Sequence, residues 1–353
     1  MNRAIPCALA ALAATAAGLP SARGELTLYL NRGGGAYTPG EPNDSRQNIS
    51  SVADAPVDLP PWAIDDGTWQ EVTACVAELF APFDVAVTDL DPGDAPHMEV
   101  VVGGNPGQLG LDPDTAGVSP FLSNCSVIDD SIVFVFPEVL GDDVRLVCEA
   151  IAQEAAHSIG LDHQYLCEDP MTYLTGCGDK RFLFRDSVCG ELEPRECRCG
   201  GMQNSARLLL ERLGAGAQPT LWLSAPTGED PVVQGFVVTA AVTQAPTQVA
   251  LYVDGELFDR APPVAADGPY ALVDLATFNL SPGGHQLDVV AQWADGSQAQ
   301  EGARVEVIGG EVGGGVSAGL CSAAGGSGGA PLALTALGWL CLGRRRARRR
   351  RRR

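Results

Sequence analysis

Apolar residues recur at helical spacing in two segments of the first two hundred residues. In Thr68–Phe80 they stand three and four positions apart, and Asp143–Ile159 repeats the same period. This spacing gives each segment one apolar face, so we predict two amphipathic helices. A third predicted helix, Gln203–Leu213, ends at Gly214.

Short β-branched runs bounded by Asp, Pro or Gly predict strands around these helices. They are Glu25–Leu30, Asp84–Thr88, Met98–Val102 and Ser131–Phe136. The polar, proline-rich segment 43–61 predicts a loop, and the pattern between Gly160 and the last helix is irregular and rich in cysteine. The order predicts an α+β domain over residues 24–216: a mixed twisted sheet, three helices and an irregular lower lobe.

Residues 218–308 show a different pattern, with short alternating segments separated by turn dipeptides. The segments are 221–223, 235–243, 248–253, 270–275, 285–291 and 304–308, and the turns include Asp254-Gly255 and Asp295-Gly296. About seven strands in so short a region predict an all-β sandwich. The runs at 251–255 and 282–287 resemble the bacterial immunoglobulin-like domains that are appended to exported enzymes, which implies a spacer or binding module.

The two ends of the chain have the composition of targeting segments. Residues 1–22 combine Arg3, an apolar run and small residues, as a secretory signal peptide does, with a buried terminal helix as the alternative. A glycine-rich linker, 309–329, contains Cys321 and precedes an apolar stretch and an arginine-rich end over 330–353. This arrangement resembles the C-terminal sorting tails of myxobacterial surface proteins. It implies transient retention in the inner membrane, followed by surface display or release, with a simple tail anchor as the alternative.

Charge and cysteine content narrow the function classes. The net charge of the chain is −21, although nine of its 23 basic residues lie in the last ten positions. The part of the chain before these ten residues is therefore strongly acidic and repels phosphate backbones, which excludes nucleic acid as its partner. Eight cysteines lie between positions 75 and 199, which predicts up to four disulfides in an exported chain. A zinc ribbon built from Cys189, Cys197 and Cys199 is the alternative for three of them.

The segment from Gln153 to His163 contains the residues that predict chemistry. Gln153 and His157 are four positions apart on one helical face, so both side chains can reach a common metal ion. Glu154 is placed to activate a metal-bound water as general base, and Gly160 can end the helix so that His163 completes the site.

This segment resembles the zinc-binding stretch of the metzincin metalloproteases, and Met171 with Tyr173 resembles that family's Met-turn. The resemblance implies one catalytic zinc held by Gln153, His157 and His163, with Gln153 standing where the family has histidine. It further implies Glu154 as general base, Tyr173 as a further ligand or oxyanion stabiliser, and Met171 as an apolar floor.

Two functions follow, and the sequence leaves both open. The first is an exported, monomeric zinc-dependent endopeptidase that hydrolyses protein or peptide substrates. The second is an inactive pseudo-protease that serves as a surface binding or structural module, which Gln153 favours because an amide oxygen is a poorer zinc ligand than an imidazole nitrogen. An unrelated α/β fold with a chance histidine pair is a third alternative. Aspartate-rich turns at 89–91, 112–114, 129–130 and 142–143 are possible calcium sites.

Overall fold

The computed structural model describes residues 25–228, 231–264, 268–278 and 280–309. The predicted signal peptide, and the linker and tail beyond residue 309, lie outside the described residues. Within the described ranges, no helix is both long enough and apolar enough to cross a bilayer.

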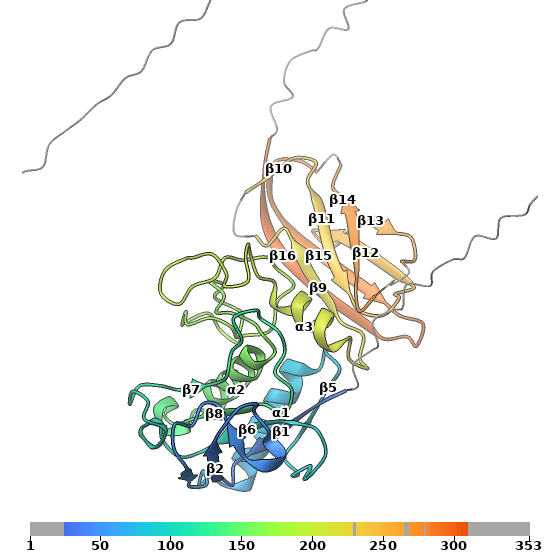
Figure 1. Cartoon of the computed structure of the whole chain (residues 1–353). Helices are drawn as coiled ribbons and strands as arrows, with labels where there is room; N and C mark the ends of the chain where they lie inside the picture. Colours follow the sequence, from blue (N-terminus) through green and yellow to red (C-terminus); the bar gives the residue numbers. More distant parts are fainter. Residues whose placement is uncertain (1–24, 229–230, 265–267, 279, 310–353) are drawn as a thin grey trace, which may run out of the picture. The chain divides into compact units, whose positions relative to one another are not determined.

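The first part of the chain is built on a mixed five-stranded sheet (Figure 1). Its strands, in spatial order, are β5 (Val85–Thr88), β1 (Leu26–Asn31), β6 (Met98–Val102), β8 (Ile132–Val135) and β7 (Gly117–Val118). All neighbours pair in parallel except β7, which runs antiparallel to β8 at the sheet edge. The four longer strands match their predicted positions within one residue, whereas β7 was not predicted.

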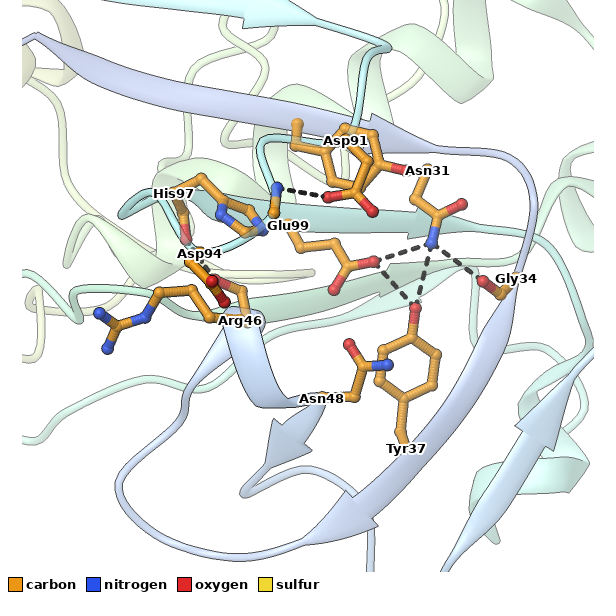
Figure 2. Close-up of a pocket in the computed structure, with 12 residues that line it drawn as sticks. Asn31, Gly34, Tyr37, Arg46, Asn48, Asp91, Asp94, His97 and Glu99 are labelled. Carbon is orange, nitrogen blue, oxygen red and sulfur yellow. Dashed lines mark hydrogen bonds between the residues drawn. The ribbon is translucent and has the colours of Figure 1, made fainter.

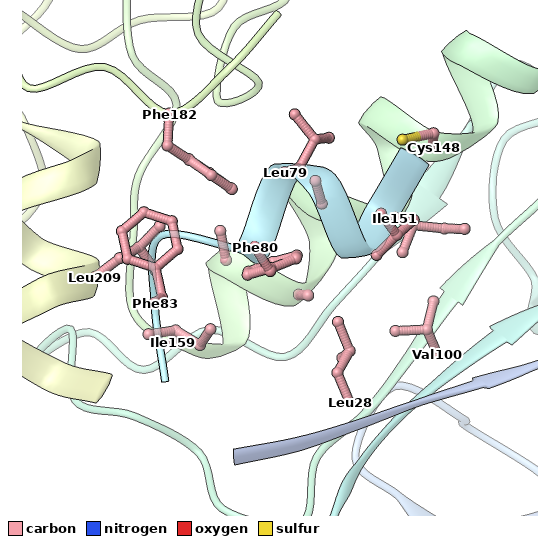
Figure 3. Close-up of a cluster of buried hydrophobic side chains, with 14 of the residues drawn as sticks. Leu28, Leu79, Phe80, Phe83, Val100, Cys148, Ile151, Ile159, Phe182 and Leu209 are labelled. Atoms are coloured by element: carbon pink, nitrogen blue, oxygen red, sulfur yellow. The ribbon is translucent and has the colours of Figure 1, made fainter. Parts of the chain in front are cut away.

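Two helices cover one face of this sheet, as the apolar spacing predicts. They are α1 (Asp66–Phe80) and α2 (Val144–Ser158), each capped by the side chain of the aspartate before it. Their apolar faces meet the sheet in a cluster that includes Phe80, Ile151 and Val100, all 1% exposed or less (Figure 3). This burial fixes α2, whose far end carries the predicted site residues.

The opposite face of the sheet is covered by a small three-stranded sheet. It consists of β3 (Ile49–Ser50), β2 (Gly35–Pro39) and β4 (Val57–Leu59). Tyr37 and Phe134 pack edge to face between the two layers, with ring centroids 5.4 Å apart. The prediction of a plain loop over 43–61 was therefore wrong in part, because strands of two and three residues are too short to show a period.

Three of four disulfides hold the irregular segment between α2 and α3 (Ser205–Leu213), and Cys75–Cys148 joins α1 to α2. The four pairs are Cys75–Cys148, Cys125–Cys199, Cys167–Cys177 and Cys189–Cys197. They confirm the predicted framework and agree with an exported protein. The zinc-ribbon alternative was wrong, because all three of its cysteines are bonded in these pairs.

The second part of the chain folds as two sheets around one apolar core (Figure 1). One sheet has the order β10 (Val232–Val233), β16 (Gln298–Ile308), β15 (Gly283–Gln292), β12 (Gln248–Val253) and β13 (Glu256–Ala261). The other has the order β14 (Ala271–Ala276), β11 (Val237–Val242) and β9 (Leu221–Ala225). The architecture is thus α+β followed by a β-sandwich. The boundary between the two predicted domains, near residue 217, stays a prediction. Close to it in the sequence, Trp222 belongs to the buried core of the first part, and its indole N–H donates to the Phe182 carbonyl at 3.0 Å.

Candidate functional site

The site lies where α2 ends. Gly160 has φ +95°, and a Cβ there would lie 2.2 Å from the Cys125 carbonyl oxygen, so only glycine fits. The chain then reverses, with Gly160 N–H donating to the His157 carbonyl at 2.8 Å and Leu161 N–H to that of Ala156 at 3.0 Å. This turn brings His163 back against His157, as the sequence predicts.

The two histidines face each other through their Nε2 atoms, which are 2.9 Å apart. His157 Nδ1 lies 2.7 Å from the Leu161 carbonyl oxygen, and His163 Nδ1 lies 2.9 Å from Glu191 Oε1. Both partners only accept hydrogen bonds, so each Nδ1 donates, and in the neutral tautomer this leaves Nε2 with a lone pair. Two lone pairs at this distance repel unless a proton or a cation lies between them.

Glu154 lines the same pocket, which has a volume of about 180 Å³. Its side chain is 8% exposed, and a Cβ on Gly117 would lie 2.8 Å from its Oε1, so this carboxyl packs directly against β7. Burial raises the pKa of Glu154 to about 8, and its hydrogen bond with Ser119 opposes that shift. The pKa of His157 is lowered to about 4 by burial and by His163 beside it, which keeps its imidazole neutral.

Gln153 does not line this pocket. It lies one turn before His157 on α2, and its Nε2 is buried with no hydrogen-bond partner in the part of the chain that the structure describes. Rotating the amide by half a turn places Oε1 where the unpaired nitrogen is now. An acceptor there would suit a cation, whereas the amide nitrogen cannot ligate one.

The two residues of the predicted Met-turn lie in different surroundings. Met171 is fully buried in the core cluster and does not line the pocket. Tyr173 does line it; its ring centroid is 4.4 Å from that of His163, and its side chain is 52% exposed. Of these two residues, Tyr173 alone can therefore contact a ligand in the pocket.

An ion-pair cluster supports His163 from behind. Arg195 donates to both oxygens of the buried Asp162 at 2.6 and 2.7 Å, and to Glu191 Oε1 at 2.8 Å. The hydrogen bonds and charge of Arg195, with those of His163, lower the pKa of Glu191 to about 2. Asp162, His163 and Glu191 are spaced closely enough to hold a metal ion, but Arg195 already occupies the two carboxylates. We interpret this cluster as the support that orients His163.

Replacing Glu191 with glutamine tests that interpretation. The amide oxygen still accepts from His163 Nδ1, but the negative charge behind the imidazole is lost. For a zinc ion held by the histidine pair, as proposed below, we expect the affinity to fall about 10–100-fold, measured by competition with a chromogenic chelator. Glu193→Gln, an exposed change two residues away, should leave the affinity unaltered; equal losses in both variants would rule out the support role.

A second buried carboxylate braces the turn that leads to Tyr173. Asp169 is completely buried and accepts hydrogen bonds from Met171 N at 2.9 Å, Leu183 N at 3.0 Å and Ser205 Oγ. Asp169→Ala strands these donors, so we expect the free energy of unfolding in urea to fall by roughly 3–5 kcal/mol. Asp179→Ala, at an 88% exposed side chain, should change it by less than about 0.5 kcal/mol. A small loss in Asp169→Ala would show that the turn is held by other contacts.

Several pocket residues were not predicted from the sequence. Gly117 begins β7 and Ser119 follows it, and Phe121 stacks edge to face on His157 with ring centroids 6.3 Å apart. Arg198 lies over the Phe121 ring at 5.2 Å. The four-residue spacing of Glu191 and Arg195 was the only local signal for the support cluster, and it is common in sequences without a site.

Neither family models nor curated proteins give a match to this chain. Among solved structures, the fibronectin(III)-like modules of CbhA from Clostridium thermocellum are 18% identical over 26% of this chain and 98% of that one, with a TM-score of 0.20. A lytic polysaccharide monooxygenase from Jonesia denitrificans is 14% identical over 34% and 75%, with a TM-score of 0.19. OgpA from Akkermansia muciniphila in complex with an O-glycopeptide is 11% identical over 81% and 93%, with a TM-score of 0.22. Similarities this weak carry no argument about function.

Proposed function

We propose that this protein is an exported zinc-dependent endopeptidase of the metzincin type. The observation that carries the proposal is that the Nε2 atoms of His157 and His163 face each other at 2.9 Å in one pocket. Each imidazole has its other nitrogen held by an acceptor, as zinc-ligating histidines do. The surrounding order supports the family assignment: a sheet, a backing helix α1 and a site helix α2 that ends at Ser158, two residues before Gly160.

The donor set fits zinc. Two imidazole nitrogens that share a tetrahedral zinc at about 2.0–2.1 Å lie about 3.3 Å apart, so the observed 2.9 Å needs only a small separation of the rings. Gln153, the third ligand that the resemblance implies, does not line the pocket, so its amide would have to move toward the two histidines in order to ligate. When bound, the zinc ion would act as a Lewis acid toward water and the substrate carbonyl.

The residues around the pocket have separate tasks in this proposal. Burial disfavours the ionised form of Glu154, and the charge of a bound zinc ion would favour that form. The ionised carboxylate would accept a proton from the attacking water and return it to the departing amine, while its hydrogen bond with Ser119 keeps it in place. Tyr173 donates its phenol proton to the oxyanion that develops on the substrate carbonyl.

The position of β7 at the edge of the sheet favours a peptide as the class of substrate. It pairs with β8 on one side only, and Gly117 and Val118 line the pocket beside Glu154. A free strand edge can pair with an extended peptide and present its backbone to the adjacent site. The absence of a side chain at Gly117 leaves room there for Glu154.

The second candidate function is the pseudo-protease, and one observation favours it. Gln153 does not line the pocket, so the site offers two histidines where the metzincin pattern has three. In this case the same fold would serve as a binding or structural module at the cell surface, together with its β-sandwich.

Zinc content separates the two functions. We would measure metal by elemental analysis in the full chain, exported to an oxidising compartment and purified without chelators. The endopeptidase requires about one zinc per chain, lost in His157→Ala, and cleavage of a peptide library that a chelator stops. A folded protein that takes up no zinc even from excess metal would overturn it and leave the pseudo-protease.

A further inference from the structure

A second polar pocket lies on the other face of the central sheet, away from α1 and α2. It has a volume of about 340 Å³ and is formed by β1, β2, β6 and the loop before β6 (Figure 2). Glu99 on β6 points into it, because its neighbours Met98 and Val100 face the helices. The pocket has no part in the function proposed above.

Glu99 carries an unpaired oxygen in this pocket. Its side chain is 3% exposed, and Oε1 accepts from Asn31 Nδ2 at 2.8 Å and from the Tyr37 hydroxyl at 2.9 Å. Oε2 has no hydrogen-bond partner among the described residues. Tyr37 has no further proton to give, and Asn31 Nδ2 is also engaged by the Gly34 carbonyl at 2.9 Å. A buried carboxylate oxygen left in this state is costly unless a donor from outside reaches it.

The rest of the pocket is acidic as well. Asp91 and Asp94 line it, and both are exposed at its rim. Arg46 also lines it, but its guanidinium binds Asp44 at 2.9 Å and Asp130 at 3.1 Å. Burial and the carboxylates around it raise the pKa of Tyr29, in the same pocket, to about 12.

His97 is the other basic side chain in the pocket. Its ring is buried, and its Nδ1 lies 2.8 Å from the Ala95 carbonyl oxygen, so this nitrogen is directed at the backbone and not at Glu99. Burial raises the pKa of Glu99, although the hydrogen bonds from Asn31 and Tyr37 and the charge of His97 oppose that shift.

The spacing of the acidic groups disfavours a bare metal ion. In the described part of the chain, Asp162, His163 and Glu191 form the one group of three ligating side chains close enough to share an ion, and none of them lines this pocket. The volume of 340 Å³ is also many times the roughly 30 Å³ of one water, and falls in the range of small-ligand pockets. An organic cation fits both the spacing of the acidic groups and the volume of the pocket.

We propose that this pocket binds the ammonium or guanidinium group of a lysine or arginine side chain from a peptide. The N–H groups of that cation would donate to Glu99 Oε2 at the base of the pocket, while Asp91 and Asp94 attract it at the rim. The pocket would thus recruit a basic peptide on the face of the sheet opposite the histidine pair.

Calorimetric titration of the purified full chain tests the proposal. The probes are Nα-acetyl-lysine amide, Nα-acetyl-arginine amide, the uncharged arginine analogue Nα-acetyl-citrulline amide, putrescine, and calcium chloride alone. We expect at least one capped basic amino acid to bind, and to bind about tenfold or more weakly to Glu99→Gln, which keeps the contacts of Oε1. Citrulline should not bind, and Glu256→Gln, an exposed change on β13, should behave as the unaltered protein.

Three results would overturn the proposal. If neither capped amino acid binds, the pocket does not recognise a basic side chain. If Glu99→Gln is then also more heat-stable than the unaltered protein, Glu99 is a protonated structural group. Calcium binding that depends on Glu99 would assign the pocket to a metal ion. Tighter binding of putrescine than of the capped amino acids would assign it to free amines. If Glu99→Gln does not fold, Asp91→Asn at the exposed rim replaces it, with an expected loss of about threefold.

Discussion

Replacing Glu154 with glutamine should reduce peptide hydrolysis by about 100- to 10,000-fold, which is the usual contribution of a general base. Glutamine has the shape of the carboxyl and can keep the contact with Ser119, but it cannot accept a proton from water. Zinc content and thermal unfolding should stay as they are, because the zinc donors and the packing against Gly117 are unchanged. The measurement is the rate of cleavage of a quenched fluorescent peptide selected from a library.

Glu71→Gln, an exposed change on α1, is the matched control and should retain full activity. Turnover that survives in Glu154→Gln would contradict the role of Glu154 as the base. Loss of activity together with loss of zinc would show that this carboxyl holds the metal site together rather than moving a proton.

The second large effect concerns Gln153. A histidine at this position presents a nitrogen ligand one turn before His157, so Gln153→His should raise zinc affinity. Losing a residue that only orients a zinc ligand lowers zinc affinity about 10–100-fold. Adding a histidine that ligates zinc directly should change the affinity by more, so we expect Gln153→His to raise it by more than about 100-fold. Competition with a chelator of known affinity measures it.

Gln70→His, on the exposed face of α1, controls for zinc bound by an added surface histidine. If both variants gain affinity equally, position 153 is not directed at the metal site. If Gln153→His also acquires peptidase activity that the unaltered chain lacks, substitution of the first ligand is what separates this protein from an active enzyme.

Elements with a long apolar period were predictable, and so was the histidine pair. Both amphipathic helices lie within two residues of their predicted bounds, because each buries one continuous face. The return of His163 to His157 was predictable because Gly160 is the kind of residue that ends a helix and reverses the chain.

The rest of the site depends on residues far apart in the sequence. Strand β7 has two residues and gives no period, yet it forms the wall beside Glu154. Arg195 reaches Asp162 across 33 positions, and the disulfides that shape this segment could not be paired from the sequence. Glu99 interrupts an apolar strand, and nothing local indicates which face of the sheet it lies on.

The disulfide Cys189–Cys197 encloses both Glu191 and Arg195, the groups that support His163. In a reducing cytoplasm this ring is open, and the support for His163 has no fixed position. In the proposed enzyme, the support for the histidine pair would therefore be complete only after the chain has been exported. Oxidation of this cysteine pair would then act as a maturation step.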